Sequence, residues 1–161
     1  MLTADLAKTL TTLIGELVDG PPRFAYMLNQ GDVGLLRSLD RLSAEAASAS
    51  SQGGGSIAAH VEHVRYGLSL MNRWAGGEED PFTGADWSAS WELTTVSDAE
   101  WKALRDALRD EAHRWMAALG TPREVNRIEL NGVVGSIAHL AYHLGAIRQI
   151  DRTMRGPTAN G

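Results

Sequence analysis

The sequence predicts a single all-α domain, and two observations carry this prediction. Apolar residues recur three or four positions apart in four long segments, as they do on the buried face of a helix. The one stretch that resembles a strand, residues 124–130, alternates weakly and is too short to found a sheet. The chain has 161 residues, of which 43% are hydrophobic, which is enough for one sizeable core. The four segments therefore predict a helical bundle.

The first two predicted helices precede a connection rich in serine and glycine. Residues 3–18 carry leucines at helical spacing, with Thr3 as the cap and Gly20-Pro21-Pro22 as the stop. Residues 33–42 predict a second, shorter helix. Residues 48–56 are interpreted as a flexible loop within the same domain, because apolar segments lie on both sides of it.

The third predicted helix covers residues 56–75 and ends at Gly76-Gly77. A long connection, residues 78–96, follows it and contains Trp87 and Trp91. We expect this connection to fold back over the bundle, because exposed indole rings would leave much apolar area in water.

The fourth predicted helix begins with a capping box made by Ser97 and Glu100 and runs to about residue 119. Gly120-Thr121-Pro122 ends it, and a turn through Asn131-Gly132 leads to a last helix that reaches about residue 154. Residues 155–161 are expected to form a disordered tail. The predicted domain therefore spans residues 1–154.

The composition excludes several kinds of function. With 15 Lys and Arg against 20 Asp and Glu, the net charge is −5, so we expect no nucleic-acid partner. No apolar run approaches the roughly 20 residues of a membrane span, and the first residues lack the basic region of a signal peptide. We therefore expect a cytoplasmic protein with no membrane partner. Because the chain has five histidines and no cysteine, histidine must carry any transition-metal chemistry.

Four of the five histidines lie in two of the predicted helices. His139 and His143 are four residues apart, so on a helix they stack on one face and can share one metal ion. His60 and His63, in the third helix, are two candidates for a further ligand. Glycine, serine and alanine flank both pairs, and such small neighbours predict a pocket in the bundle interior.

Other polar residues receive less specific interpretations. A histidine beside an apolar face is often a hydrogen-bonded core residue, so the cluster can also be structural. His113 stands apart and is interpreted as a surface residue. Glu62 points about 100° away from His63 around the helix, so it is not assigned as a general base. Glu129 can reach the mouth of the site, and Arg148 is interpreted as a solvated side chain or as a group that binds an anionic substrate.

The motifs, taken in order, resemble the DinB/YfiT-like superfamily. The family pattern has a serine that opens a helix, a histidine seven residues later, and H-x3-H on a later helix. Ser56 with His63, and His139 with His143, match this pattern. The resemblance spans about residues 3–154. It implies a four-helix bundle with up-up-down-down topology and long crossover connections, commonly a homodimer.

The resemblance also implies a divalent metal ion, most often nickel or zinc. The implied ligands are His63, His139 and His143. His60 is then a neighbouring group or an alternative ligand. Characterised relatives include thiol transferases that use bacillithiol or mycothiol, and a mycothiol-dependent maleylpyruvate isomerase.

The leading hypothesis is a metal-dependent enzyme of thiol S-transferase or hydrolase type, with a small-molecule substrate such as a low-molecular-weight thiol. A divalent ion on three neutral imidazoles lowers the pKa of a bound water or thiol. Leu144-Gly145-Ala146 stands where the family often has Arg-Gly-Gln, and Gly55 replaces a frequent aromatic residue, so no particular substrate is carried over. The catalytic residues stay unassigned. The alternative is a non-catalytic, stress-associated bundle dimer with a structural or metal-free histidine cluster.

Overall fold

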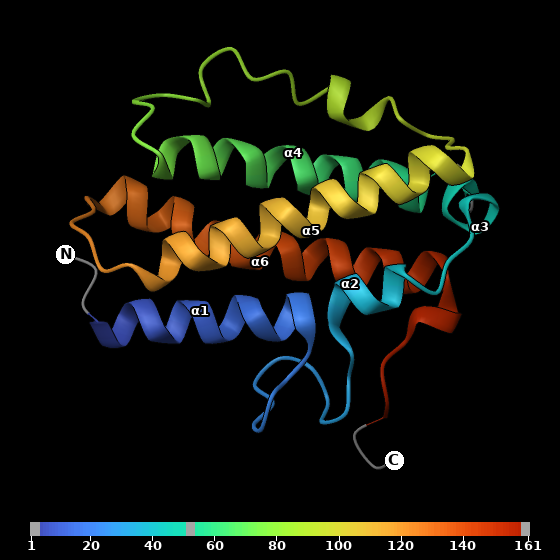
Figure 1. Cartoon of the computed structure of the whole chain (residues 1–161), viewed down its shortest axis with the longest axis horizontal. Helices are drawn as coiled ribbons and strands as arrows, with labels where there is room; N and C mark the ends of the chain where they lie inside the picture. The colour runs from blue at the N-terminus through green and yellow to red at the C-terminus, as the bar shows by residue number, and fades with distance from the viewer. Residues whose placement is uncertain (1–3, 51–53, 159–161) are drawn as a thin grey trace.

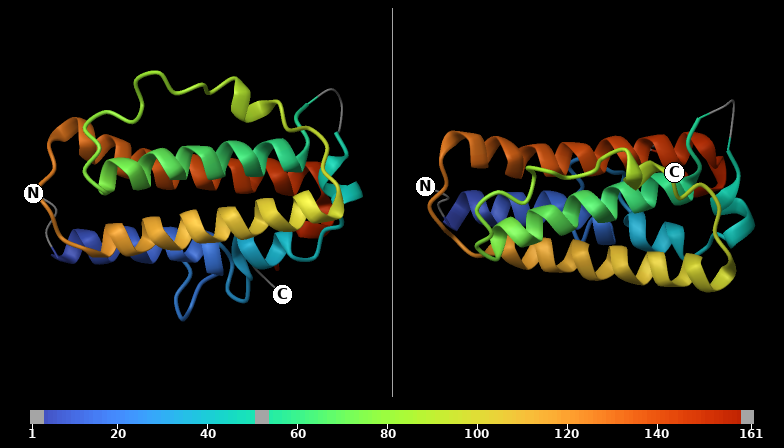
Figure 2. Two further views of the ribbon diagram at one scale, coloured as in Figure 1. Left: turned by 45° about the horizontal axis from the view of Figure 1, so that its top comes forward. Right: turned by 90° about the horizontal axis from the view of Figure 1, so that it is seen from above.

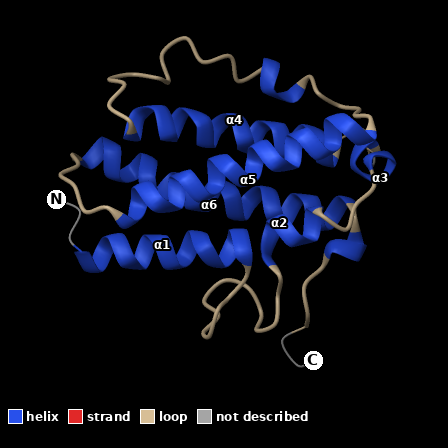
Figure 3. Ribbon diagram, viewed as in Figure 1, coloured by secondary structure: helices blue, strands red, loops and turns tan. Residues whose placement is uncertain are grey.

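The computed structural model describes residues 4–50 and 54–158, and this part of the chain is helical without any strand, as predicted (Figures 1 and 3). It contains six α-helices and two 3₁₀-helices. In chain order they are α1 (Ala4–Asp19), α2 (Gly34–Leu39), α3 (Ala44–Ser48), α4 (Ile57–Ala75), η1 (Ala89–Trp91), α5 (Asp98–Gly120), α6 (Arg127–Ile150) and η2 (Arg152–Met154). The sequence analysis did not predict α3, a five-residue helix whose N-cap is Ser43.

The four long helices enclose one apolar core. Helix α4 packs against α5 and α6, and α1 packs against the same two helices on the other side (Figure 2). The apolar residues of α5 that recur at helical spacing are buried in this core; they are Trp101, Leu104, Leu108, Trp115 and Leu119. The indole N–H of Trp115 donates to the hydroxyl of Ser136 on α6 at 2.9 Å, so even the polar atom of this buried ring has a partner. The helical spacing therefore identified the core face correctly.

The chain directions differ from the expected up-up-down-down order. Helices α1 and α6 run one way and α4 and α5 run the other way, which gives up-down-down-up in chain order (Figures 1 and 2). The connection that holds α2 and α3 continues to the far end of the bundle, so α4 returns antiparallel to α1. Residues 76–97 then run back along α4 to the end where α4 began, and α5 is parallel to α4 for that reason.

The beginning of the last helix also differs from the prediction. Helix α6 begins at Arg127 with Asn126 as its N-cap. The Asn126 side chain accepts from the N–H groups of Ile128 and Glu129 at 2.8 and 3.0 Å, and the Glu129 carboxylate accepts from the Asn126 N–H at 2.6 Å. The turn predicted at Asn131-Gly132 is wrong, because this capping box starts the helix earlier and both residues continue it.

The segment between α1 and α2 is held by buried carboxylates. Glu16, only 1% exposed, accepts from the N–H groups of three consecutive loop residues, Tyr26, Met27 and Leu28, at 2.6–3.0 Å. Asp32 accepts from the Arg148 guanidinium at 2.8 Å and ties the segment to α6. The two ends of this segment lie side by side at Gly20. Gly20 has a φ of +91°, and a Cβ there would collide with the Asp32 carbonyl, so the position requires glycine.

Two irregular stretches lie partly outside the described residues. Within the loop predicted over 48–56, residues 51–53 are outside them, and so are residues 159–161 of the predicted tail. The described part of that tail contacts the body of the protein, because the Asn29 side chain donates to the Pro157 carbonyl at 2.6 Å. Among the described helices, none combines the length and the hydrophobicity that a membrane span requires.

Candidate metal centre

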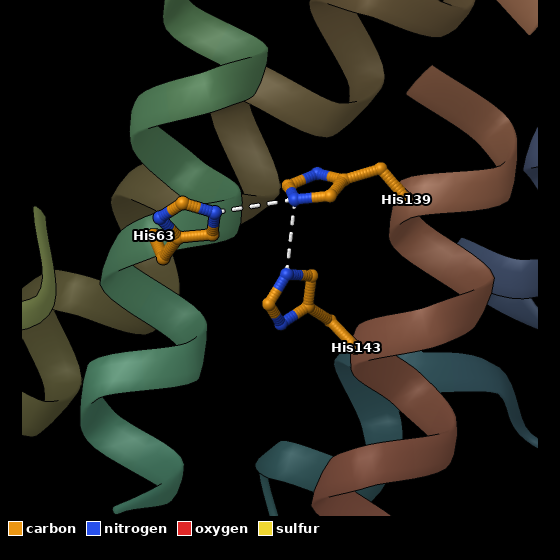
Figure 4. A group of neighbouring side chains, drawn as sticks. All are labelled: His63, His139 and His143. Carbon is orange, nitrogen blue, oxygen red and sulfur yellow. Dashed lines mark hydrogen bonds between the residues drawn. The ribbon is translucent and has the colours of Figure 1, made fainter. Parts of the chain in front are cut away.

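Three histidines predicted as ligands come together between α4 and α6 (Figure 4). His63 projects from α4, and His139 and His143 project from successive turns of α6 toward it. The Nε2 atom of His139 lies 3.2 Å from Nε2 of His63 and 3.0 Å from Nε2 of His143. One ring nitrogen of each residue lies within 4.8 Å of those of the other two.

These separations fit nitrogen atoms that share one metal ion. A bond between zinc and imidazole is about 2.0–2.1 Å long, so two nitrogens at angles of 90° to 110° on one ion lie roughly 2.9–3.4 Å apart. The two measured Nε2 separations, 3.2 and 3.0 Å, fall in this range. The three residues can therefore hold a metal ion with imidazole nitrogens alone, a donor set that suits zinc and nickel.

The imidazoles are buried, and burial keeps them neutral. His143 is 1% exposed and His63 is 8% exposed. Burial, with a further contribution from the neighbouring histidines, lowers the pKa of His63 to about 4 and that of His143 to about 3. Burial also lowers the pKa of His60 and of His139. At neutral pH these rings keep a free nitrogen lone pair, which is the form that binds metals.

We predict that acid destabilises the metal-free protein through these rings. Their pKa values lie below the ordinary 6.5 in the folded state. The unfolded chain therefore binds protons first, and stability falls as the pH drops from about 6.5 toward 4 and stays level above that window. Thermal melting between pH 8 and pH 4 measures this. The melting temperature of His143→Phe should fall less steeply with decreasing pH than that of the wild type. Equal slopes for the two proteins would contradict the prediction.

A serine from the long connection orients His63. The Nδ1 atom of His63 lies 2.7 Å from the Ser90 hydroxyl, and that hydroxyl donates to the Trp87 carbonyl at 2.6 Å. Because its proton is used there, Ser90 accepts from Nδ1–H, and Nε2 of His63 is left unprotonated toward His139. Sequence reasoning missed Ser90, since a serine 27 residues further along the chain, in an irregular segment, carries no periodic signal.

His60 lies behind His143 and outside the three-histidine cluster. Its Nδ1 atom is 2.8 Å from Nδ1 of His143, on the side of that ring opposite Nε2. If His143 donates Nδ1–H to His60, its Nε2 is free to face His139. Of the two candidates on α4, the geometry therefore brings His63 into the cluster and makes His60 the residue that orients His143.

The long connection folds back over the cluster, as predicted, but its indole rings stay partly in water, with Trp87 40% and Trp91 36% exposed. The Trp91 ring stacks on His63 with centroids 4.4 Å apart and packs edge-on against His60 at 5.1 Å. The Trp87 ring lies 5.6 Å from His63. These rings exclude water from one side of the imidazoles, which strengthens electrostatic interactions there.

The other polar residues considered from the sequence are engaged elsewhere. Their partners are Arg65 for Glu62, the Asn126 N–H for Glu129, Asp32 for Arg148 and Asp19 for the exposed His113. Glu129 therefore serves as a helix cap. The Arg148 side chain is only 14% exposed and lies in an ion pair, so its interpretation as a solvated side chain is wrong.

The fold and the site define an all-α protein with a three-histidine cluster between two of its long helices. Comparisons of the chain with protein-family models, curated proteins and solved structures found no match. Membership of the DinB/YfiT-like superfamily therefore stays a prediction from the residues.

Proposed function

We propose that the protein is a DinB-like, metal-dependent enzyme of thiol S-transferase or hydrolase type. In this proposal His63, His139 and His143 hold one divalent ion, nickel or zinc. The observation that carries it is the convergence of imidazole nitrogens, with Nε2 of His139 at 3.2 and 3.0 Å from its two neighbours. A homodimer and a cytoplasmic location belong to the same proposal.

The residues around the cluster suit this chemistry. A divalent ion supplies a positive charge that lowers the pKa of a nearby water or thiol. The three imidazoles are neutral and leave that charge uncompensated, and Trp91 keeps water away from one side of His63. Because the chain has no cysteine, a reacting thiol must come from the substrate.

One observation favours the non-catalytic alternative, a bundle dimer that binds a partner in stress. Among the described residues, no carboxylate joins the three histidines, so the cluster has no acidic general base beside it.

Metal loading tests the proposal. Protein purified without a histidine tag is mixed with Ni²⁺ or Zn²⁺, and native mass spectrometry counts the ions bound. We expect one ion per chain and a higher melting temperature with metal present, because a ligand that binds only the folded state stabilises it. Less than one ion in ten chains would overturn the proposal. Loaded protein that transfers no thiol to electrophiles and hydrolyses no ester would favour the non-catalytic alternative.

We predict that Ser90→Ala weakens metal binding. Without the hydroxyl, the Nδ1 atom of His63 loses its acceptor, and its ring loses a fixed tautomer and orientation. Loss of such an outer partner costs about 10–100-fold in affinity. Competition against a chromophoric chelator measures the change. The matched control is Ser88→Ala in the same connection, because Ser88 is exposed and its side chain makes no capping hydrogen bond. Equal affinities for the two variants would contradict the prediction.

A further inference from the structure

A cavity of about 490 Å³ adjoins the histidine cluster, with His63 and His139 in its wall. Helix α4 contributes Met71, the long connection contributes Phe82 and Trp87, and α6 contributes two glycines. Its size lies within the range of small-molecule sites. Ligands of that size are therefore able to lie directly against the imidazoles.

The cavity contains no charged group to pair with an ion. Its lining residues include no Asp, Glu, Lys or Arg. The hydroxyl of Ser136, also in the wall, donates to the Val133 carbonyl at 2.7 Å and accepts from Trp115 at 2.9 Å. In the metal-free protein, a carboxylate or ammonium group bound there would give up part of its hydration without gaining a charged partner among the lining residues.

Glycines keep this space open. A Cβ placed on Gly132 or Gly135 would meet nothing within 4 Å, and neither has a positive φ. Alanine would therefore fit both positions and would favour the helix more than glycine does. Neither packing nor backbone conformation requires glycine there, and a larger side chain at either position would take up part of the space that these glycines line.

A neighbouring cavity makes anions still less suitable. It measures about 460 Å³ and shares Met71, Phe82 and Gly132 with the first. Three carboxylates, those of Glu79, Asp80 and Glu129, line it, and no Lys or Arg does. An anion approaching from that side meets charges of its own sign.

We infer that the cavity binds the uncharged aromatic or alkyl body of a small-molecule substrate, and that Gly132 and Gly135 set the size of that body. The inference rests on the proposed function, which makes the histidine cluster the reactive end of the same site. For the part of the substrate that lies away from the histidines, the lining favours an apolar group over a charged one, a property that the metal ligands alone do not determine.

Methyl NMR of metal-free protein labelled at methionine tests the inference. Met71 lines the cavity, and Met71→Leu identifies its signal. Benzyl alcohol should shift this signal in a saturable way. Benzoate, which has the same ring with a carboxylate, should bind at least about 10-fold more weakly. Equal binding of the two compounds, or no shift with benzyl alcohol, would overturn the inference.

Glycine variants test which residues set the size. Gly135→Leu should weaken benzyl alcohol binding at least about 10-fold, because the new side chain occupies the cavity. Gly145→Leu is the matched control: it lies on the same helix, its Cβ also has open space, and it does not line this cavity. Both variants should melt at or above the wild-type temperature. If Gly135→Leu fails to fold, Gly132→Ala replaces it with a smaller intrusion and a smaller expected loss.

Zn²⁺ titration of the wild type, Gly135→Leu and Gly145→Leu separates the metal proposal from the cavity inference. We expect all three proteins to bind Zn²⁺ with equal affinity. If Zn²⁺ binds none of them while benzyl alcohol behaves as expected, the metal proposal is overturned and the cavity remains an apolar binding site. If Zn²⁺ binds all three and Gly135→Leu binds benzyl alcohol like wild type, the cavity inference is overturned and the metal site stands.

Discussion

Replacing His139 with alanine is expected to reduce the affinity for Ni²⁺ or Zn²⁺ by more than about 100-fold, which exceeds the usual loss from an outer partner. His139 is central in the cluster, because its Nε2 atom is close to Nε2 of both His63 and His143. Two imidazoles of the cluster would remain, and His60, which contacts His143 through Nδ1, lies outside the cluster. His139 is also the most exposed of the three, so its removal disturbs packing least.

Isothermal titration of tag-free protein measures this effect. The matched control is His113→Ala, which also removes one histidine but from the exposed pair with Asp19. The control should bind metal like wild type and keep its melting temperature within a few degrees, as exposed pairs contribute at most about 1 kcal/mol. A His139→Ala protein that still binds one ion with wild-type affinity would exclude the three-histidine site.

The second large effect concerns stability. Arg148→Met is expected to lower the free energy of unfolding by about 3–5 kcal/mol, the usual cost of leaving one member of a buried ion pair without the other. The Asp32 side chain is only 1% exposed and would keep just the Gly34 N–H at 2.8 Å as a partner. The pair joins α6 to the segment between α1 and α2, so both elements should loosen.

Urea denaturation measures the loss, and a second variant assigns its cause. Adding Asp32→Asn to Arg148→Met removes the unpaired charge and should recover part of the stability. The control Lys102→Met breaks an exposed pair with Asp106 and should change the free energy of unfolding by less than about 1 kcal/mol. If Arg148→Met costs no more than Lys102→Met, the buried pair does not stabilise the fold as proposed.

The helices and one half of the site could be predicted because their signals are local. The capping box at Ser97 and Glu100 is present as expected, with the Ser97 N–H donating to the Glu100 carboxylate at 2.8 Å. His139 and His143 share a face because i and i+4 residues always do so on a helix. The prediction of a turn at Asn131-Gly132 was wrong because two local signals competed. The turn propensity of this pair is weaker than the capping box at Asn126, which starts the helix before it.

The all-α class, most helix bounds and the two pairs of histidines could be predicted, since each depends on hydrogen bonds and spacing within one helix. The packing of α4 against α6 brings His63, 76 residues before His139, into contact with it and places His60 against the far side of the His143 ring. Tertiary packing also sets the helix directions, the Ser90 contact and the open cavity. These features depend on the paths of two long connections, and no local period in the sequence encodes such paths.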